Sequence, residues 1–254
     1  RRLLAALETH TRRHRIILET HELDSALTAD RGEDSRSVLQ LEARCAELSH
    51  ALVANCGGTL RAWEETHAAL PSLRQVSHNA TAPARYRTSP ASRDPVVRVL
   101  GSARAFKGVS QLQAISECSP LPIEWIGASD DERSRAADTT SMRILPPIPY
   151  TEVPDVLARS QVLLLPLQDN RFGRWLTSPL KLWDYLATGT PIVAPDLPTI
   201  TEIQALARTE LHLYRTGDTS DLIRALSEAQ SAPTRSPFLR SWDDRARELE
   251  SLFE

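Results

Sequence analysis

Short apolar segments alternate with helical patterns along most of this 254-residue chain, and this alternation restricts its fold more than any other feature. In the second part of the chain, strands are predicted at "VVRVL" (96–100), "IEWIG" (123–127), "RILP" (143–146), "QVLLLP" (161–166) and "PIVA" (191–194). Helical stretches fall between most of these runs. Nearly continuous apolar strands separated by helices are typical of parallel sheets covered on both faces, so the sequence predicts an α/β fold.

The first 80 residues show the same alternation. "RIILE" (15–19) and "ALVAN" (51–55) predict buried strands with a helical pattern between them, and a second helix around Trp63 leads into "RQVSHNA" (74–80). The next stretch, "TAPARYRTSPASRD" (81–94), is polar, contains proline and lacks periodicity, as linkers between domains do. We therefore expect a domain boundary there.

Composition excludes several classes of protein. The formal net charge of -3 gives no general attraction to nucleic acid or to anionic membranes. Cys45, Cys56 and Cys118 form no CxxC pair, so reduced thiols are expected rather than a disulfide framework or a zinc site. The longest apolar run, "VLLLPL" (162–167), is far shorter than the ~20 residues of a membrane helix. No signal peptide is visible, and because the sequence starts without Met inside a helical pattern, we expect residues upstream of it.

Only two of the 30 basic residues are lysines, and both lie where a predicted strand leads into a helix. Lys181 lies in "SPLKLWDYLATGTPIVAPD" (178–196), and Lys107 lies in "GSARAFKG", where a strand ends at Gly101 and a loop carries Arg104. A compact ammonium differs from the planar fork of arginine, so a chain that nearly avoids lysine has reason to place one at a particular site.

The helix after residue 177 predicts an anion site. Thr177 or Ser178 is expected to cap it, Pro179 to occupy its first position, and Gly189 to end it. Its first N–H groups, the positive end of its dipole and Lys181 would then lie at the carboxyl end of the preceding strand.

Two cationic loops of one sheet can converge on a single ligand, and a diphosphate matches their charge. Asp184, one turn after Lys181, is placed to accept hydrogen bonds from sugar hydroxyls. The ordinary alternatives are a solvated surface charge for Lys107 and a surface carboxylate for Asp184.

The segments "GSARAFKGVSQL" and "SPLKLWDYLATGTPIVAPDLPTITEI" resemble the donor half of retaining glycosyltransferases of the GT-B fold, family 4 type. The resemblance implies two Rossmann-like domains with parallel sheets facing each other across a cleft, the second of which binds a nucleotide diphosphate sugar. "ILETHEL", "ALVANCGGTLRAW" and "VSHNA" are similar to the end of the family's first domain, whose opening strands are not in this sequence. The implied division is a truncated acceptor-side domain (1–80), a linker (81–94), a donor-binding domain (95–236) and a closing helix that crosses back to the first domain (237–254).

The same resemblance implies roles for individual residues. Arg104, Lys107 and Lys181 would hold the donor diphosphate during catalysis, Asp184 would bind the ribose, and His21 would line the acceptor side. The remaining implied donor-binding residues are Gly101, Ser102, Thr177, Ser178, Pro179 and Leu180. For His21, an ordinary paired histidine at a strand end is an equally weighted alternative.

Three positions depart from the family pattern. Leu176 stands where the first of two glutamates is usual, and Asp184 replaces the second glutamate. Arg104 lies two places later than the common arginine, which directly follows the glycine.

The implied reaction is glycosyl transfer with retention of anomeric configuration, without a metal or another cofactor. The donor would be a UDP-, GDP- or dTDP-sugar, and the acceptor a saccharide, a glycolipid or another molecule, as in polysaccharide biosynthesis. No nucleic acid partner is expected, and the expected location is the cytoplasm, with peripheral association at the inner face of the membrane left open. The alternatives are a sugar-nucleotide 2-epimerase of the same fold and a non-catalytic nucleotide-sugar-binding protein.

Overall fold

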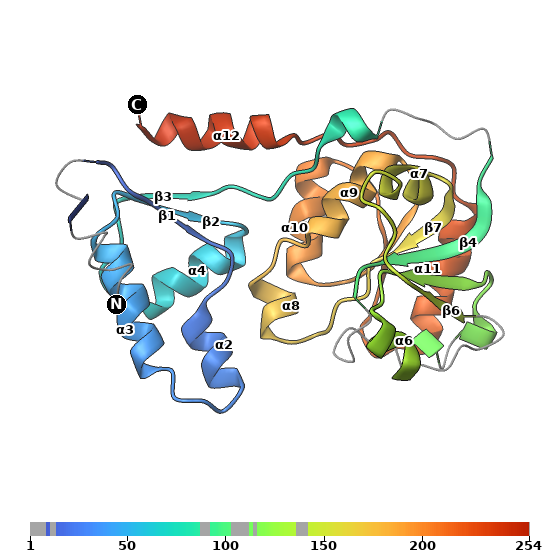
Figure 1. Cartoon of the computed structure of the whole chain (residues 1–254), viewed down its shortest axis with the longest axis horizontal. Coiled ribbons are helices and arrows are strands. Elements are labelled where there is room, and N and C mark those ends of the chain that lie inside the picture. The colour runs from blue at the N-terminus through green and yellow to red at the C-terminus, as the bar shows by residue number, and fades with distance from the viewer. Residues whose placement is uncertain are drawn as a thin grey trace. The chain divides into compact units, whose positions relative to one another are not determined.

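The structure is a computed structural model that describes residues 9–10, 14–86, 92–102, 112–113, 116–135 and 142–253. Its residues group by their contacts into two units (Figure 1). The first unit comprises Arg1–Asn79, Asn170–Ser178 and Trp242–Glu254, and the second comprises Ala80–Asp169 and Pro179–Ser241. Residues 170–178, which lie inside the predicted donor domain, thus group with the first unit; the predicted domain boundaries stay a prediction.

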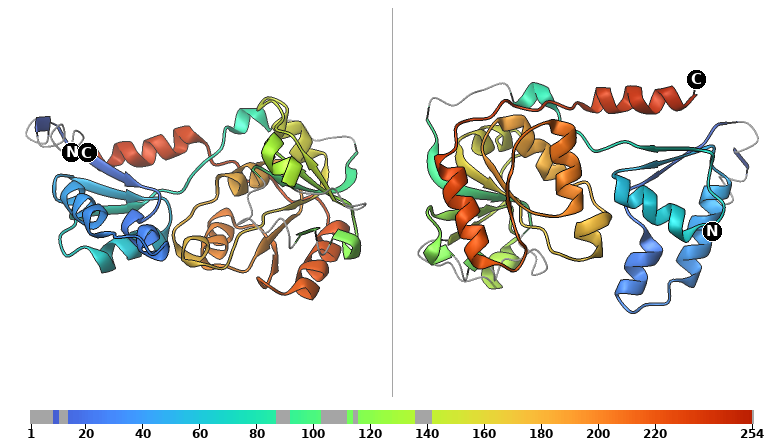
Figure 2. Two further views of the ribbon diagram at one scale, coloured as in Figure 1. Left: turned by 60° about the horizontal axis from the view of Figure 1, so that its bottom comes forward. Right: turned by 180° about the vertical axis from the view of Figure 1, so that it is seen from behind.

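The first unit contains a three-stranded parallel sheet in the order β1-β2-β3. The strands are β1 (Ile17–Thr20), β2 (Ala51–Ala54) and β3 (Leu73–Val76), and the helices between and beside them are α2 (Asp24–Asp30), α3 (Arg36–Glu47) and α4 (Gly57–Thr66). Leu52 of β2 is buried with Leu23, Ala46 and Trp63, which come from the helices and their starts. The three helices therefore cover one face of this sheet (Figure 2).

The last helix, α12 (Trp242–Glu250), lies on the other face of the same sheet. The Arg245 guanidinium is 2.8 Å from Glu19 Oε1, and Ser77 Oγ donates to Glu248 Oε2 at 2.9 Å. Because side chains alternate along a strand, Glu19 and its neighbour in register, Val53, face away from the helices that cover Leu52. The end of the chain is thus part of the first unit.

The second unit contains a six-stranded parallel sheet in the order β6-β5-β4-β7-β8-β9. Its strands are β4 (Asp94–Leu100), β5 (Ile123–Ile126), β6 (Met142–Leu145), β7 (Ser160–Leu164), β8 (Ile192–Pro195) and β9 (His212–Tyr214). The five predicted strands are confirmed to within two residues at each end. The sequence pattern misses β9 because a three-residue strand is too short to give an apolar run.

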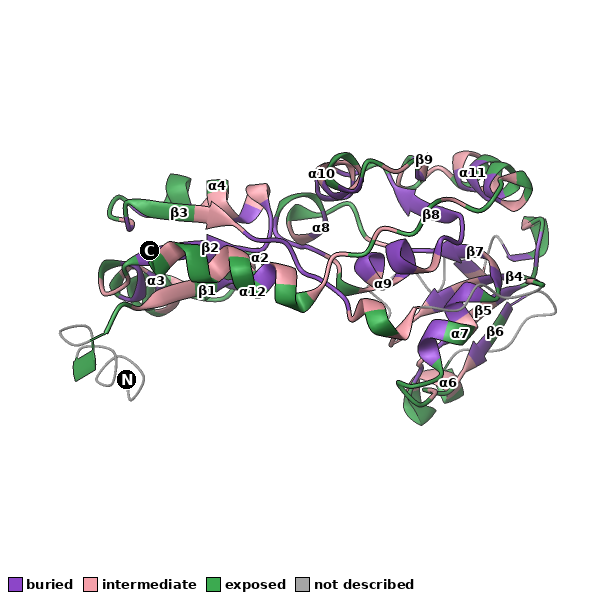
Figure 3. Ribbon diagram, turned by 90° about the horizontal axis from the view of Figure 1, so that it is seen from above, coloured by how far each residue is buried: buried purple, intermediate pink, exposed green. Residues whose placement is uncertain are grey.

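Helices cover both faces of the six-stranded sheet. Val162 and Leu164 of β7 pack in a cluster with the buried side of α11 (Thr219–Ser231). The intervening Leu163 packs with α7 (Val153–Ala158), α9 (Leu180–Thr188) and α10 (Pro198–Ala207). β7 and β8 are accordingly almost entirely buried (Figure 3), which confirms the predicted α/β architecture.

The start of α9 differs from the prediction, whereas its end agrees. The helix begins at Leu180, Pro179 precedes it with an extended backbone (ψ 114°), and no side chain caps the helix. The prediction that Thr177 or Ser178 caps it and that Pro179 is its first residue is therefore wrong. Both hydroxyl residues are buried in the first unit. Gly189 ends the helix in the left-handed conformation (φ 74°), as predicted.

Arg235 covers the carboxyl end of α9. Its guanidinium donates to the carbonyl oxygens of Tyr185, Leu186 and Thr190 at 2.5 to 3.1 Å. Burial, with a smaller contribution from Arg93, lowers the pKa of Arg235 to about 10, so the side chain keeps its charge at neutral pH. A cation at this end also complements the helix dipole.

Tyr185 ties α9 to the central strands, and its hydroxyl gives a direct test of this packing. Tyr185 is fully buried, and its hydroxyl accepts from Leu100 N at 2.9 Å and donates to Leu164 O at 3.4 Å.

We expect Tyr185→Phe to lower the free energy of unfolding by about 1–3 kcal/mol, because a buried N–H loses its acceptor. Urea unfolding measures this loss. Tyr150→Phe is the matched control, since Tyr150 is 65% exposed; equal stability of both variants would contradict the role of this hydroxyl.

Candidate functional site

Lys181 and Gly101 meet at the carboxyl edge of the six-stranded sheet. A Cβ atom added to Gly101 would lie 2.4 Å from Lys181 Nζ, so the ammonium rests directly against the backbone where β4 ends. Gly101 has φ +111°, a conformation that residues with a Cβ rarely adopt. Lys181 belongs to the first turn of α9, which follows β7 in the sequence. Lys181 is half-buried, and its ammonium can approach the end of β4 because Gly101 has no Cβ atom.

These two residues lie at the point where the strand order of the sheet reverses. β4 is followed in sequence by its neighbour β5 on one side, while β7 lies against β4 on the other side. In open α/β sheets, ligands bind outside the carboxyl ends of the strands at such a switch point. The topology therefore identifies the end of β4 as the expected ligand site of the second unit.

The backbone of Gly101 is held firmly by β5. Trp125 Nε1 donates to Gly101 O at 2.6 Å, and Gly101 N donates to Ile126 O at 2.7 Å. Trp125 is fully buried. Gly127, with φ +113°, passes so close that an added Cβ would be 3.0 Å from Gly101 Cα. The surface against which Lys181 rests is therefore preorganised.

Two of the predicted phosphate ligands, Arg104 and Lys107, lie outside the described residues. Ser102, which follows Gly101, is half-buried. The structure thus brings Lys181 to the end of β4, which precedes Arg104 and Lys107 in the sequence, and the convergence of the two lysines stays a prediction.

Asp184 is half-buried and already has a partner within the second unit. Its Oδ1 accepts a hydrogen bond from Thr81 Oγ1 at 2.6 Å. Burial, followed by the nearby Asp184 carboxylate, raises the pKa of the Tyr86 phenol. No sequence pattern predicts this contact, because Thr81 lies 103 residues before Asp184.

The residues just before α9 are held by the first unit. Asn79 Nδ2 donates to Ser178 O at 2.7 Å, and Thr177 and Ser178 are 8% and 3% exposed. Pro179 is half-buried and Leu180 is 55% exposed. The first turn of α9, whose N–H groups lack intrahelical acceptors, therefore begins with an exposed residue.

His21 lies at the end of β1, in the first unit, and is exposed. Its Nε2 is 2.8 Å from Glu19 Oε1, the same oxygen that pairs with Arg245. Asn55 Nδ2 donates to the His21 carbonyl oxygen at 2.7 Å. The structure thus brings His21 together with a carboxylate of its own strand, and a role on the acceptor side stays a prediction.

The segment before α9 contains a short helix that the sequence pattern did not indicate, α8 (Arg171–Trp175). Asn170 caps it by accepting from Gly173 N at 2.8 Å. The Trp175 carbonyl oxygen accepts from Cys56 Sγ at 3.3 Å, and a Cβ added to Gly58 would lie 2.2 Å from that oxygen. The adjacent glycines of "CGGTL" were the one available signal that a backbone approaches α4 closely here.

Leu176, at the position of the family's usual first glutamate, is 1% exposed and packs in the core of the first unit. Leucine has no hydrogen-bonding atom in its side chain, so Leu176 cannot take the role of the family's usual first glutamate.

Two kinds of feature are absent from the described residues. Within the described ranges, no group of three or more His, Cys, Asp or Glu side chains is arranged to hold a metal ion. None of the helices seen there has both the length and the apolar character needed to cross a membrane.

No family model matches the chain, and no curated protein matches its sequence. Solved structures do match. Sucrose-phosphate synthase from Thermosynechococcus elongatus aligns with a TM-score of 0.72 and 16% identity, over 93% of this chain and 66% of that one. HepE from Anabaena, in complex with UDP and glucose, aligns with a TM-score of 0.70 and 15% identity, over 99% and 76% of the two chains.

A third similar structure is the UDP-forming α,α-trehalose-phosphate synthase from Burkholderia xenovorans, in complex with glucose-6-phosphate. It aligns with a TM-score of 0.67 and 14% identity, over 99% of this chain and 70% of that one. The chain therefore has the GT-B fold of these glycosyltransferases, as predicted, and spans 66% to 76% of the length of the three.

Proposed function

We propose that this protein transfers a glycosyl group from a nucleotide diphosphate sugar to a saccharide or glycolipid acceptor, with retention and without a metal. The observation that carries the proposal is the Lys181 ammonium held against Gly101 at the switch point of a GT-B fold. The HepE structures hold UDP or UDP-glucose. We therefore take UDP as the nucleotide to test first, ahead of GDP and dTDP.

In the proposed mechanism, Lys181 and the start of α9 stabilise the negative charge that develops on the leaving diphosphate. Each hydrogen bond to a charged group contributes roughly 1.5–3 kcal/mol. One preorganised donor can change the rate by ~10²–10³. Arg104 and Lys107 are proposed to add to this stabilisation from the loop after Gly101. Together, three cations and a helix start can supply the charge that a metal ion supplies in other enzymes.

Asp184 is the proposed ribose ligand. A carboxylate has about four lone-pair positions, so the hydrogen bond from Thr81 leaves capacity for a sugar hydroxyl. The same bond fixes the orientation of the carboxylate on α9. We propose that Thr81 thereby orients Asp184 for the donor.

Calorimetry with UDP and uridine tests the donor site. We expect UDP to bind about 100-fold more tightly than uridine, because most of the charged hydrogen bonds go to the diphosphate. Addition of a chelator is expected to leave UDP affinity unchanged. Equal affinities for UDP and uridine would contradict the proposal. So would a failure of UDP, GDP and dTDP all to bind.

Incubation with UDP-sugars then separates the alternatives. Acceptor-dependent release of UDP supports the transferase. An isomerised sugar nucleotide formed without acceptor favours the 2-epimerase, and tight binding without turnover favours a non-catalytic binding protein.

A further inference from the structure

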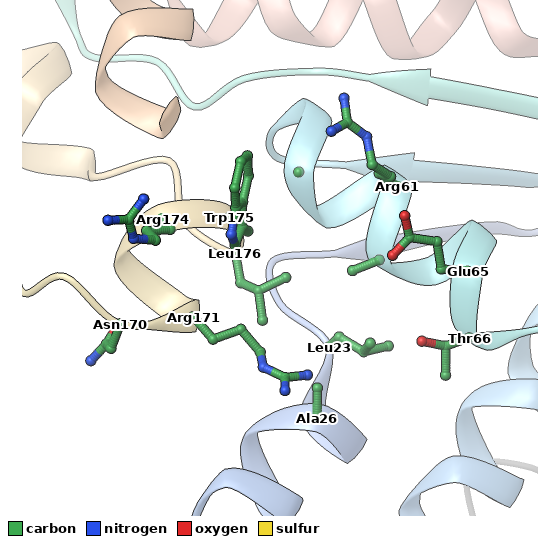
Figure 4. A pocket seen from close by; sticks show the side chains of 12 residues that line it. Leu23, Ala26, Arg61, Glu65, Thr66, Asn170, Arg171, Arg174, Trp175 and Leu176 are labelled. Atoms are coloured by element: carbon green, nitrogen blue, oxygen red, sulfur yellow. The ribbon is translucent and has the colours of Figure 1, made fainter. Parts of the chain in front are cut away.

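The first unit contains a cavity of about 590 Å³ that the donor site does not use (Figure 4). It lies between α2, α4 and α8, and its volume is in the range of small-molecule sites, roughly 300–1,000 Å³. The residues that line it are Leu23, Ala26, Gly58, Arg61, Ala62, Glu65, Thr66, Asn170, Arg171, Arg174, Trp175 and Leu176. All of them belong to the first unit.

One part of the cavity wall is apolar. Leu23 and Leu176 are almost fully buried and contribute to the core beneath, and Ala26 and Ala62 extend the surface. Trp175 is 40% exposed, so a large apolar group of this wall faces solvent. An apolar group that entered the cavity would remove this surface from water.

Three of the residues that line the same cavity are arginines. Arg61 comes from α4 and Arg171 and Arg174 from α8, against the single acidic residue Glu65, which leaves a net charge of +2 among the lining residues. Arg171 Nε lies 3.2 Å from Asp30 Oδ2, so this ion pair partly neutralises the charge of Arg171. In a chain with a net charge of -3, this excess of positive charge is local.

Guanidinium groups bind phosphate oxygens through two parallel hydrogen bonds, which makes arginine the preferred partner of phosphate at specific sites. We propose that the cavity binds a phosphomonoester that carries an apolar group, with the phosphate at the lining arginines and the apolar group against Trp175 and the leucines. The first unit contains residues 1–79, and the proposed transferase is expected to bind its acceptor on this side. The anionic part of an acceptor is therefore the expected occupant, and this last step alone rests on the proposed function.

The probe for this site is n-octyl phosphate below its micellar concentration, compared with neutral n-octyl glucoside and with inorganic phosphate. Trp175 reports binding by fluorescence, because Trp63, Trp125 and Trp183 are buried and Trp242 lies outside the cavity. We expect octyl phosphate to bind at least about tenfold more tightly than octyl glucoside or inorganic phosphate, since only octyl phosphate contacts both the arginines and the apolar wall. Trp175→Phe should remove the fluorescence change while calorimetry still detects binding.

Arg174→Gln is expected to weaken octyl phosphate about tenfold through loss of a charged hydrogen bond, and to leave octyl glucoside unchanged. Arg208→Gln, an exposed arginine of the second unit, is the matched control and should change neither. Equal binding of octyl phosphate and octyl glucoside would overturn the proposal. An unchanged affinity for octyl phosphate in the double variant Arg61→Gln, Arg174→Gln would also overturn it.

Competition distinguishes the two sources of such a phosphate. Displacement of octyl phosphate by phosphatidic acid vesicles, with phosphatidylcholine vesicles without effect, supports a lipid source. Displacement by phenyl phosphate, a soluble phosphomonoester with an apolar group, but not by phosphatidic acid vesicles supports a soluble source. Displacement by phosphatidylcholine vesicles would count against phosphate recognition. All of these titrations omit nucleotide, so their outcome is independent of whether UDP binds to the second unit.

Discussion

Replacing Lys181 with alanine is expected to lower glycosyl transfer by about 10²–10³, the effect of removing one preorganised donor to a developing charge. Stability should change by less than about 1 kcal/mol, because the side chain is half-buried, and single charges near the surface contribute little. Initial rates of UDP release in the presence of acceptor measure the first quantity. Urea unfolding measures the second.

Lys181→Arg is the informative control for this prediction. It keeps the charge, but a planar guanidinium does not fit a position where a compact ammonium rests against Gly101. We expect its turnover to lie between those of the wild type and the alanine variant. If the purified Lys181→Ala protein is as active as the wild type, the donor site assignment is refuted.

Gly58→Ala is expected to destabilise the protein by about 1–3 kcal/mol, the usual cost of forcing an extra carbon into a packed contact. The new Cβ would lie 2.2 Å from Trp175 O and 2.9 Å from Trp175 C, and these are backbone atoms that move only if α8 moves. Intrinsic propensity predicts the opposite sign, since alanine favours a helix over glycine by up to about 1 kcal/mol, although Gly58 lies in the first turn of α4. The sign of the measured change in Tm therefore shows which effect dominates.

Cys56 gives this variant a second readout. Its thiol is fully buried and hydrogen-bonds to the Trp175 carbonyl oxygen, whereas Cys118 is exposed. In a Cys118→Ser background, we expect thiol reagents to label Cys56 faster in Gly58→Ala than in its parent. A Gly58→Ala protein that is as stable as its parent, with Cys56 equally protected, would show that α8 does not depend on this contact.

Much of the second unit could be predicted from the sequence because the signals are local. Apolar runs such as residues 161–166 mark buried parallel strands, since both faces of such a strand must be covered. Gly189 marks the end of α9 because glycine readily adopts the left-handed conformation that ends many helices. Lys181 could be placed near a helix start because the signals that begin a helix lie within a few residues of it in the sequence.

The sequence by itself thus determined the parallel α/β architecture, the lysine at the start of α9 and the glycine at the end of β4. Tertiary structure alone decided which distant groups meet: Thr81 with Asp184, Trp125 with Gly101, and α8 with Gly58. It also moved the start of α9 to Leu180 and buried Leu176 in the first unit. The reason is physical: periodicity and backbone preference act over a few residues, whereas contacts between distant segments depend on strand order and on the burial that packing achieves.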